Sequence, residues 1–292
     1  VGETPLPSGL RVAVLGDSYI SGEGTGSYWP GTDTHAWEGV ANMCHRSSAS
    51  WGYQLGLDLA GGDSSNLLFT PCSGATTASV RWGQFNEVGG ARQLGRLEAF
   101  DTPSAPVDVV FVSVGGNDAG FGDVATTCVL VPCLVPSLTS AWVSGTVGAA
   151  NRVKSLLGEV KAAAPGATVI LVGYPSILDP PTQSCAGATL NAVQSLGLAR
   201  WVGVPPELLA LASGVGVSAA EQQWVHSTFL PALNSNLAKA ASDAGVRFVN
   251  PSGWFSGHGV CSSDPYGNAL VPGNDIPGFL GPGAFLGNES FH

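Results

Sequence analysis

Short apolar runs recur along the chain, and longer segments with a helical spacing of apolar residues lie between them. The first run occupies residues 11–15, and further runs lie at 66–71, 107–114, 167–173 and 246–250. An uninterrupted apolar run of this length is typical of a strand that is covered on both faces of a parallel sheet. The pattern therefore predicts a sheet whose strands are linked by helices.

Three longer segments carry the helical spacing. The segment 48–60 places Trp51, Leu55 and Leu59 on one face, and the segment 144–164 stops at a Pro-Gly pair. A third helix is expected over 219–244, where Pro231 should kink or split it because proline lacks a backbone N–H. The β-α-β-α alternation predicts an α/β fold with a doubly wound, mostly five-stranded parallel sheet flanked by helices.

The chain shows no repeat and no low-complexity tail, which favours a single domain over residues 1–292. Residues 190–217 are apolar and are predicted to be a helical insertion. Residues 252–291 are rich in glycine and proline and predict an ordered loop that carries functional residues. No apolar run reaches the roughly 18 residues that indicate a membrane span.

Composition narrows the class of protein. The chain has 292 residues, of which 44% are hydrophobic and 11% charged, and its net charge is −10. It contains no basic cluster, so nucleic acid is not an expected partner. The six cysteines form no Cys-x-x-Cys pair and no zinc pattern, which favours disulfides and an oxidising compartment. Residues 1–7 resemble the mature end left after removal of a signal peptide, so we expect a secreted protein.

The candidate chemistry begins where the first strand ends, in Gly16-Asp17-Ser18. Ligands of open α/β sheets bind at the carboxyl ends of the strands, so Ser18 is a candidate nucleophile. The triplet alone is weak evidence, because Gly62-Asp63-Ser64 repeats it in what reads as an ordinary polar turn. The rest of the sequence must therefore decide whether Ser18 is a nucleophile.

Two further turns fall at the same predicted edge. The strand at 107–114 runs into Gly115-Gly116-Asn117-Asp118, and the amide of Asn117 suits an oxyanion hole. The strand at 66–71 runs into a turn that contains Gly74, whose N–H could point into the same pocket. Convergence of three such turns favours a serine hydrolase over three unrelated structural turns.

A serine hydrolase also needs a base, and the chain offers five histidines. His226 lies in a helical pattern and is expected to be structural, while His35 and His45 suit surface roles. His258 and His292 remain as rivals for the base. In the acid-x-x-His arrangement that ends the chain, either Glu289 or the main-chain carbonyl of Ser290 could hold the imidazole of His292.

These residues together resemble the SGNH (GDSL-type) hydrolases, and most of all the secreted three-disulfide lipases, esterases and phospholipases of actinobacteria. The matching segments are Gly16-Asp17-Ser18-Tyr19 with Ser21-Gly22-Glu23-Gly24, then Gly74, Gly115-Gly116-Asn117-Asp118 and Glu289 to His292, in the order of the family. The fragment Cys44-His45-Arg46-Ser47 is also similar to the secreted subgroup.

The resemblance assigns roles to these positions. It implies that Ser18 is the nucleophile and His292 the general base and later acid. It implies an oxyanion hole made by the N–H groups of Ser18 and Gly74 and the side-chain amide of Asn117. It also implies sequential disulfides, which are Cys44–Cys72, Cys128–Cys133 and Cys185–Cys261. No cofactor and no metal are implied, and we expect a monomer.

The chain departs from the family pattern at two points. The family acid is usually aspartate, whereas Glu289 stands here, and in some relatives a backbone carbonyl orients the histidine instead. We prefer the Ser290 carbonyl, because glutamate is one methylene longer than the usual acid. Relatives also continue beyond this histidine, so we expect either a clipped chain or a longer natural protein.

Three functions fit this reading. The first is hydrolysis of acyl or lipid esters, with residues 190–217 either lining an acyl groove or forming ordinary core. The second is removal of acyl groups from carbohydrates, on which Tyr28, Trp29 and Trp37 could stack. The third is an inactive binding module for lipid or glycan. The chain has no Gly-x-Ser-x-Gly, Ser-x-x-Lys, His-Glu-x-x-His or Walker A motif, which argues against the other common hydrolase classes and P-loop NTPases.

Overall fold

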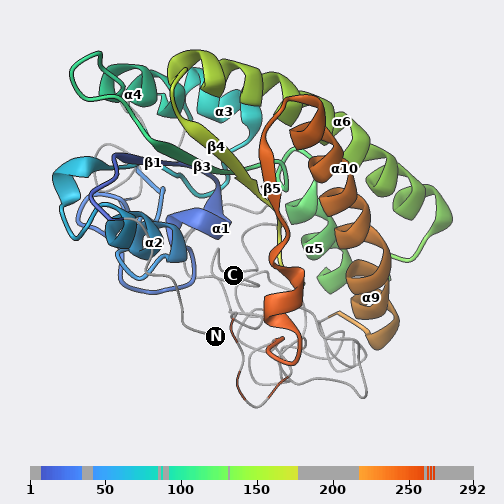
Figure 1. Ribbon diagram of the computed structural model, residues 1–292. Coiled ribbons are helices and arrows are strands. Elements are labelled where there is room, and N and C mark those ends of the chain that lie inside the picture. The colour runs from blue at the N-terminus through green and yellow to red at the C-terminus, as the bar shows by residue number, and fades with distance from the viewer. Residues whose placement is uncertain are drawn as a thin grey trace, which may run out of the picture. The chain divides into compact units, whose positions relative to one another are not determined.

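A five-stranded parallel sheet is the centre of the fold (Figure 1). The computed structural model describes residues 8–34, 42–84, 87, 92–130, 132–176, 217–259, 262, 264 and 266. The strand order is β2-β1-β3-β4-β5. The strands are β1 (Val12–Gly16), β2 (Leu67–Phe69), β3 (Val109–Ser113), β4 (Thr168–Val172) and β5 (Arg247–Val249). Four strands lie within the apolar runs of the sequence and β1 extends one residue beyond its run, to Gly16, so the predicted doubly wound α/β sheet is confirmed.

The order of the strands defines a switch point. The chain adds β2 on one side of β1 and then adds β3, β4 and β5 on the other side. The crossover connections therefore diverge between β1 and β3, which is where open α/β sheets bind their ligands. The register pairs Val12 with Val109 and Gly16 with Ser113, so β1 and β3 end at the same level.

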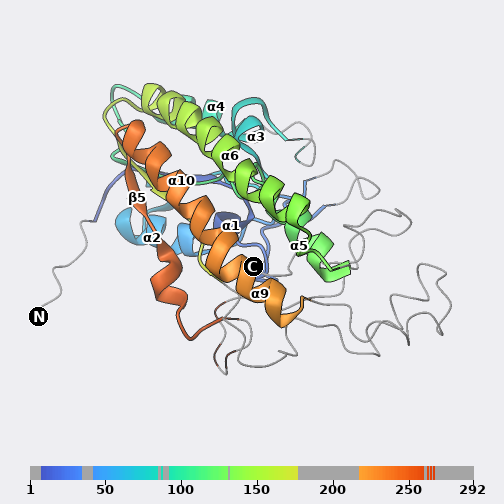
Figure 2. The same cartoon turned by 90° about the vertical axis from the view of Figure 1, so that its right-hand side faces the viewer.

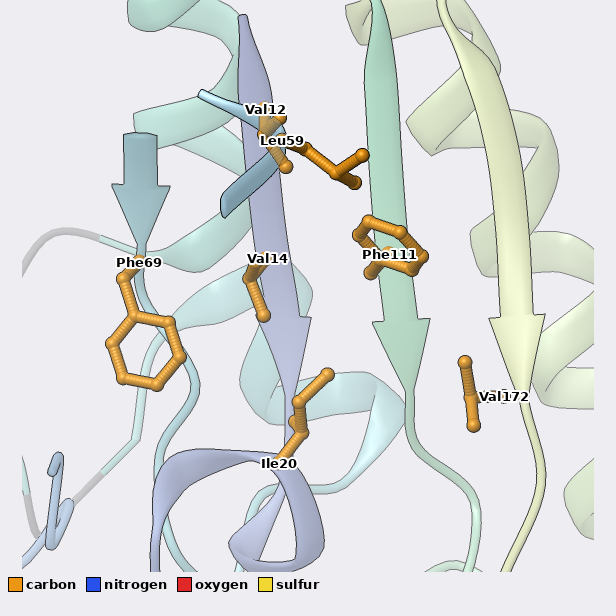
Figure 3. Packing of buried hydrophobic residues seen from close by; sticks show 7 residues of the cluster. All are labelled: Val12, Val14, Ile20, Leu59, Phe69, Phe111 and Val172. Atoms are coloured by element: carbon orange, nitrogen blue, oxygen red, sulfur yellow. The ribbon is translucent and has the colours of Figure 1, made fainter. Parts of the chain in front are cut away.

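One face of the sheet is covered by the helix α2 (Trp51–Leu59) and by α1 (Ser18–Ser21) (Figure 1). Figure 3 shows the apolar cluster on this face, which contains Val12, Val14, Ile20, Leu59, Phe69, Phe111 and Val172. Trp51 and Leu55 pack against this cluster but are only partly buried. The fully buried side of α2 is instead formed by Gly52, Gly56 and Leu59. The predicted apolar face was therefore incomplete, because it omitted the glycines.

Those glycines set the distance between α2 and the sheet. A Cβ on Gly52 would lie 2.4 Å from Cγ1 of Ile20, and a Cβ on Gly56 would lie 2.7 Å from Cδ1 of Leu67. Both distances are far below ordinary van der Waals contact. The helix can lie this close to the sheet only because both positions lack a side chain.

The opposite face is covered by the helices α3 (Thr77–Trp82), α4 (Gln93–Phe100), α6 (Pro136–Ala163) and α10 (Leu230–Asp243) (Figure 1). The carboxyl-terminal parts of α6 and α10 run side by side (Figure 2), where Lys154 Nζ lies 3.3 Å from Asp243 Oδ2. The helix α6 begins eight residues before the predicted start at 144, since 144 − 136 = 8. Proline is favoured at the first position of a helix, where its missing N–H costs nothing.

The predicted helix over 219–244 is interrupted near Pro231, as its sequence indicated. The chain forms α9 (Ala219–Trp224), then a π-helical turn (Val225–Phe229), and then α10. Within this turn the N–H of Leu230 donates to the carbonyl of Val225. Proline cannot donate to the preceding turn, and one wider turn accommodates that loss.

The chain divides into two compact units. The first contains residues 1–119, 147–174 and 234–250 and includes the whole sheet, and the second contains 120–146, 175–233 and 251–292. The expectation of a single domain stays a prediction. The second unit includes α5 (Phe121–Leu130) and α9. Of the predicted insertion at 190–217, all but Val217 lies outside the described residues.

Two disulfides join cysteines in the described part of the chain, Cys44 to Cys72 and Cys128 to Cys133. These are two of the three pairs that the family resemblance implied. The third pair, Cys185 and Cys261, lies outside the described residues. Among the helices that the structure describes, none has the length and apolar character needed to cross a membrane.

Candidate active site

The candidate nucleophile, Ser18, lies at the carboxyl end of β1, where it is the first residue of α1. Asp17 caps this short helix, because its Oδ1 accepts the N–H of Tyr19 at 3.2 Å. The N–H of Asp17 donates to the carbonyl of Ser113 at 2.9 Å. A Cβ on Gly16 would lie 2.1 Å from that same oxygen. Glycine at position 16 therefore allows the end of β1 to lie directly against the end of β3.

The turn that contains Gly74 is attached to the same strand end. The N–H of Cys72 donates to the carbonyl of Gly16 at 3.0 Å, and the N–H of Ser73 donates to the carbonyl of Cys44 at 3.1 Å. Gly74 has a φ of +74°, in the left-handed region that favours glycine. The Cys44–Cys72 disulfide joins this turn covalently to the loop before α2.

The turn after β3 carries Asn117 and Asp118 to the Gly74 turn. The Asn117 side-chain amide donates to the carbonyl of Ala75 at 3.0 Å. An asparagine amide has two N–H groups, so this contact uses one of them. Asp118 accepts the N–H of Thr77 at 2.8 Å and the hydroxyl of Thr77 at 2.7 Å. The structure thus brings the turns of Ser18, Gly74 and Asn117 together at the switch point of the sheet.

A partly buried tyrosine contacts two of these turns. Tyr174 follows β4, and its hydroxyl donates to Asp17 Oδ2 at 2.5 Å and accepts the N–H of Gly116 at 2.8 Å. Asp17 is 1% exposed. Burial raises the pKa of Asp17 from 3.8 to about 7, while the hydrogen bond from Tyr174 acts in the opposite direction. Burial, followed by the charge of Asp17, raises the pKa of Tyr174 well above its ordinary value.

The histidine at position 45 is buried, which corrects the expected surface role. It has 3% exposure, and its Nδ1 lies 2.7 Å from Glu23 Oε2. Its ring stacks on Tyr28 with centroids 4.4 Å apart. Glu23 also accepts a hydrogen bond from the hydroxyl of Ser73. His45 and Glu23 therefore hold the turn that contains Gly74 through the hydroxyl of Ser73. The position of His45 in a loop did not indicate this role.

A second buried charge supports the same turn. The guanidinium of Arg46 donates through Nε to the carbonyl of Pro71 at 2.7 Å and through Nη2 to the carbonyl of Thr70 at 3.2 Å. Its Nη2 also lies 2.9 Å from Glu87 Oε1. Burial lowers the pKa of Arg46, and Glu87 opposes this effect. Arg46 and Glu87 form a buried ion pair. The two hydrogen bonds from Arg46 fix the segment before Cys72.

The proposed base and its partners, His292, Glu289 and Ser290, lie outside the described residues, as does His35. In the second unit, His226 Nδ1 lies 2.6 Å from the hydroxyl of Ser176. His258 Nδ1 lies 2.9 Å from the carbonyl of Asp264, and its ring stacks on Tyr266 at 3.8 Å. The choice between His258 and His292 therefore stays a prediction.

Two clusters in the described part of the chain combine potential metal-binding side chains. They are Cys44, Cys72 and Glu87, and Cys128, Cys133 and Glu221. In each cluster the two cysteines form a disulfide. A metal-binding cysteine must be a thiolate, so neither cluster fits a metal ion in this state.

The sequence did not identify Tyr174 or Gln93 as site residues. Tyr174 follows β4 at the same sheet edge as Ser18 and Asn117, so the rule that found those residues could also have found it. The buried side chain of Gln93, on α4, accepts the N–H of Gly16 at 2.8 Å and donates to its carbonyl at 2.9 Å. Nothing in the local sequence of α4 signals that contact.

Comparisons with known proteins show the family to which the chain belongs. The model of the GDSL-like Lipase/Acylhydrolase family matches residues 14–270. Lipase 1 of Streptomyces coelicolor is 30% identical over 256 residues, which cover 86% of this chain and 73% of that protein. A lipase of Streptomyces rimosus is 30% identical over 257 residues, which cover 86% of this chain and 74% of that protein.

Two solved structures are similar over nearly the whole chain. Phospholipase A1 from Streptomyces albidoflavus has a TM-score of 0.62 and 25% identity, covering 98% of this chain and 92% of its own. The extracellular lipase of Streptomyces rimosus has a TM-score of 0.58 and 26% identity, with the same coverage. The family match spans most of the chain and includes the Ser18, Gly74 and Asn117 turns. The chain therefore belongs to the GDSL-like Lipase/Acylhydrolase family, and it is a carboxylic ester hydrolase.

Proposed function

We propose that Ser18 is the nucleophile of this hydrolase and His292 its general base. The N–H groups of Ser18 and Gly74 and the amide of Asn117 would form the oxyanion hole. The observation that carries the proposal is the joining of three turns at the switch point. Three hydrogen bonds join them. The N–H of Asp17 donates to the carbonyl of Ser113, and the N–H of Cys72 donates to the carbonyl of Gly16. The side-chain amide of Asn117 donates to the carbonyl of Ala75.

The reaction proceeds through an acyl-enzyme. The Ser18 hydroxyl attacks the ester carbonyl carbon while His292 takes its proton, and the negative charge passes to the carbonyl oxygen. The oxyanion hole stabilises that charge, the C–O bond to the alcohol breaks, and His292 returns the proton to the leaving alcohol. Water then attacks the acyl-enzyme while His292 takes its proton. His292 returns that proton to the Ser18 oxygen as the acyl–oxygen bond breaks, which releases the acid and restores Ser18.

The chain supplies a matched control for the nucleophile. Ser64 follows the same Gly-Asp pair, and Asp63 caps its short helix as Asp17 caps that of Ser18, but Ser64 is exposed. Ser18→Ala should abolish turnover and labelling by a serine-directed phosphonate, while Ser64→Ala should change neither. Labelling that persists in Ser18→Ala would overturn the assignment.

The base is tested by comparing two histidines. His292→Ala should lower kcat by about 10⁴-fold or more, as loss of a triad member does, while His258→Ala should retain most activity. The opposite result would assign the base to His258.

Glu289→Gln should lower kcat only slightly if the Ser290 carbonyl orients His292. A fall near ~10⁴-fold would instead assign that role to Glu289.

For the substrate we propose acyl or lipid esters. The supporting observations are the matches to proteins described as lipases and as a phospholipase A1. Rates should be measured on a series of p-nitrophenyl esters of increasing chain length beside acetylated xylan. We expect turnover across the ester series, and activity confined to the acetylated sugar would contradict the lipid ester proposal.

We also propose that the protein is exported. Disulfides persist in oxidising compartments, and the two that the structure describes support this location. The solved relative from Streptomyces rimosus is described as extracellular. Assay of culture medium and cell lysate from the source organism should find the protein in the medium.

A further inference from the structure

Tyr174 occupies an unusual place at the sheet edge. Its hydroxyl is both a donor and an acceptor, and each capacity is used by a different strand end. It donates to Asp17 after β1 and accepts from Gly116 after β3. A single oxygen atom on a third strand end therefore joins the two turns that carry Ser18 and Asn117.

The tyrosine itself is held firmly. Its N–H donates to Asn234 Oδ1 at 2.9 Å, and its carbonyl accepts from Asn234 Nδ2 at 2.8 Å. Asn234 is 4% exposed and belongs to α10. A Cβ on Gly173 would lie 2.5 Å from Asn234 Oδ1, so glycine at 173 permits this pairing. The backbone of Tyr174 is thus fixed to a helix on one face of the sheet.

The ring lies directly against the turn after β3. A Cβ on Gly116 would lie 3.0 Å from Cζ of Tyr174 and 3.2 Å from its Oη. Any larger residue at 116 would displace the hydroxyl from its position. Because its pKa is raised, the hydroxyl keeps its proton over the range in which an esterase is assayed and remains a constant donor to Asp17.

We propose that Tyr174 is a positioning residue for ester hydrolysis, and that its hydroxyl fixes the separation of the Ser18 and Asn117 turns. This inference rests on the proposed function, because it concerns the two oxyanion donors named there. The N–H of Ser18 follows Asp17 by one residue, and the amide of Asn117 follows Gly116 by one residue. Tyr174 contacts no substrate atom in this role and acts through its two neighbours.

The test is the substitution Tyr174→Phe, which keeps the ring and removes both hydrogen bonds. We expect kcat to fall by about 10- to 100-fold, less than the ~10²–10³-fold that follows removal of a direct oxyanion donor. KM should stay within about twofold, because the lost stabilisation belongs to the transition state. Titration of active sites with a phosphonate gives the folded fraction and corrects kcat for it. Tyr53→Phe, in α2, is the matched control and should leave both constants unchanged.

A double variant separates positioning from a general structural role. If Tyr174 acts through the oxyanion hole, Tyr174→Phe should cost much less in an Asn117→Ala background than in the wild-type enzyme. A kcat unchanged in Tyr174→Phe would overturn the inference. An equal fold-loss of kcat in the wild-type and Asn117→Ala backgrounds would also overturn it, because Tyr174 and Asn117 would then act independently. Activity retained in Ser18→Ala would instead overturn the proposed function, so the two failures are distinguishable.

Discussion

At the scale of single residues, the buried carboxyl beside the proposed nucleophile makes stability depend on pH. Asp17 is 1% exposed, and burial raises its pKa to about 7. An acid whose pKa is higher in the folded than in the unfolded state binds protons more tightly when folded. Its contribution to stability is therefore complete below about pH 4 and is lost as the pH rises through about 7.

The substitution Asp17→Asn measures this effect. Asparagine caps a helix as well as aspartate does, so the start of α1 should persist. A rise of the pKa from 3.8 to about 7 corresponds to about 4 kcal/mol. Wild-type protein should therefore lose up to about 4 kcal/mol of unfolding free energy relative to Asp17→Asn between pH 4 and pH 8. Urea unfolding at both pH values checks this.

The control for that measurement is Asp58→Asn, because Asp58 is exposed on α2. A pH-dependent difference that Asp58→Asn shares with Asp17→Asn would not come from the burial of Asp17. If Asp17→Asn shows a pH-independent difference from wild type, the pKa of Asp17 is not raised on folding.

The sequence predicted the part of the candidate site that local patterns encode. A strand followed by a glycine turn is visible without a structure, so Ser18, Gly74 and Asn117 could be selected. The contacts of Tyr174 and His45 could not, because they join residues that are far apart in the chain. Tyr174 and Asp17 are 157 positions apart, and nothing in either segment specifies the other.

At the scale of elements, the close approach of α2 to the sheet depends on Gly52. The substitution Gly52→Ala should destabilise the protein, because its Cβ would lie 2.4 Å from Cγ1 of Ile20. Overpacking of a core costs about 1–3 kcal/mol. The opposite sign is expected for Gly158→Ala in α6, where a Cβ would meet no atom within 4 Å. Removing a helical glycine there should stabilise by up to about 1 kcal/mol.

Thermal unfolding of both variants distinguishes the two cases. If Gly52→Ala raised the melting temperature as Gly158→Ala is expected to do, α2 could shift away from the sheet without cost. The packing in Figure 3 would then be looser than the distances indicate.

The strands were easier to predict than the helices, for a physical reason. A strand buried on both faces needs a continuous apolar run, and β1, with all five residues buried, has one. The helix α2 is amphipathic only in part, because it contacts the sheet through glycines. The short helices α3 and α4 were not predicted. The capping box of Thr76 and Ser79 at the start of α3 is a local signal that could have indicated this helix, whereas the contact of Thr77 with Asp118 exists only in the folded chain.

At the scale of the whole molecule, the two described disulfides differ in the length of chain they close. Cys44 and Cys72 are 28 positions apart, and Cys128 and Cys133 are 5 apart. Loop-closure entropy predicts roughly 3–4 kcal/mol for the longer loop and roughly 2 kcal/mol for the shorter one. Replacing both cysteines of the first pair by alanine should therefore lower the unfolding free energy more than the same change in the second pair.

The two disulfides should also differ in their effect on catalysis. The first pair joins the loop at Cys44 to the Gly74 turn, so its loss should lower kcat as well as stability. The second pair lies in the other compact unit. A loss of kcat in the Cys128 and Cys133 double variant, with the Cys44 and Cys72 variant unaffected, would contradict this difference.

The side chain of Gln93 has a consequence for the dynamics of the sheet. It holds both the N–H and the carbonyl of Gly16, although the two residues are 77 positions apart. Exchange of the Gly16 amide hydrogen with solvent should therefore report the opening of α4, whereas that of Val14 reports the separation of strands. In Gln93→Ala the Gly16 amide should lose its protection while Val14 keeps its own. The amide of Gly16, the last residue of β1, is thus protected by a helix, and a fluctuation of α4 should expose it to solvent without separating the strands.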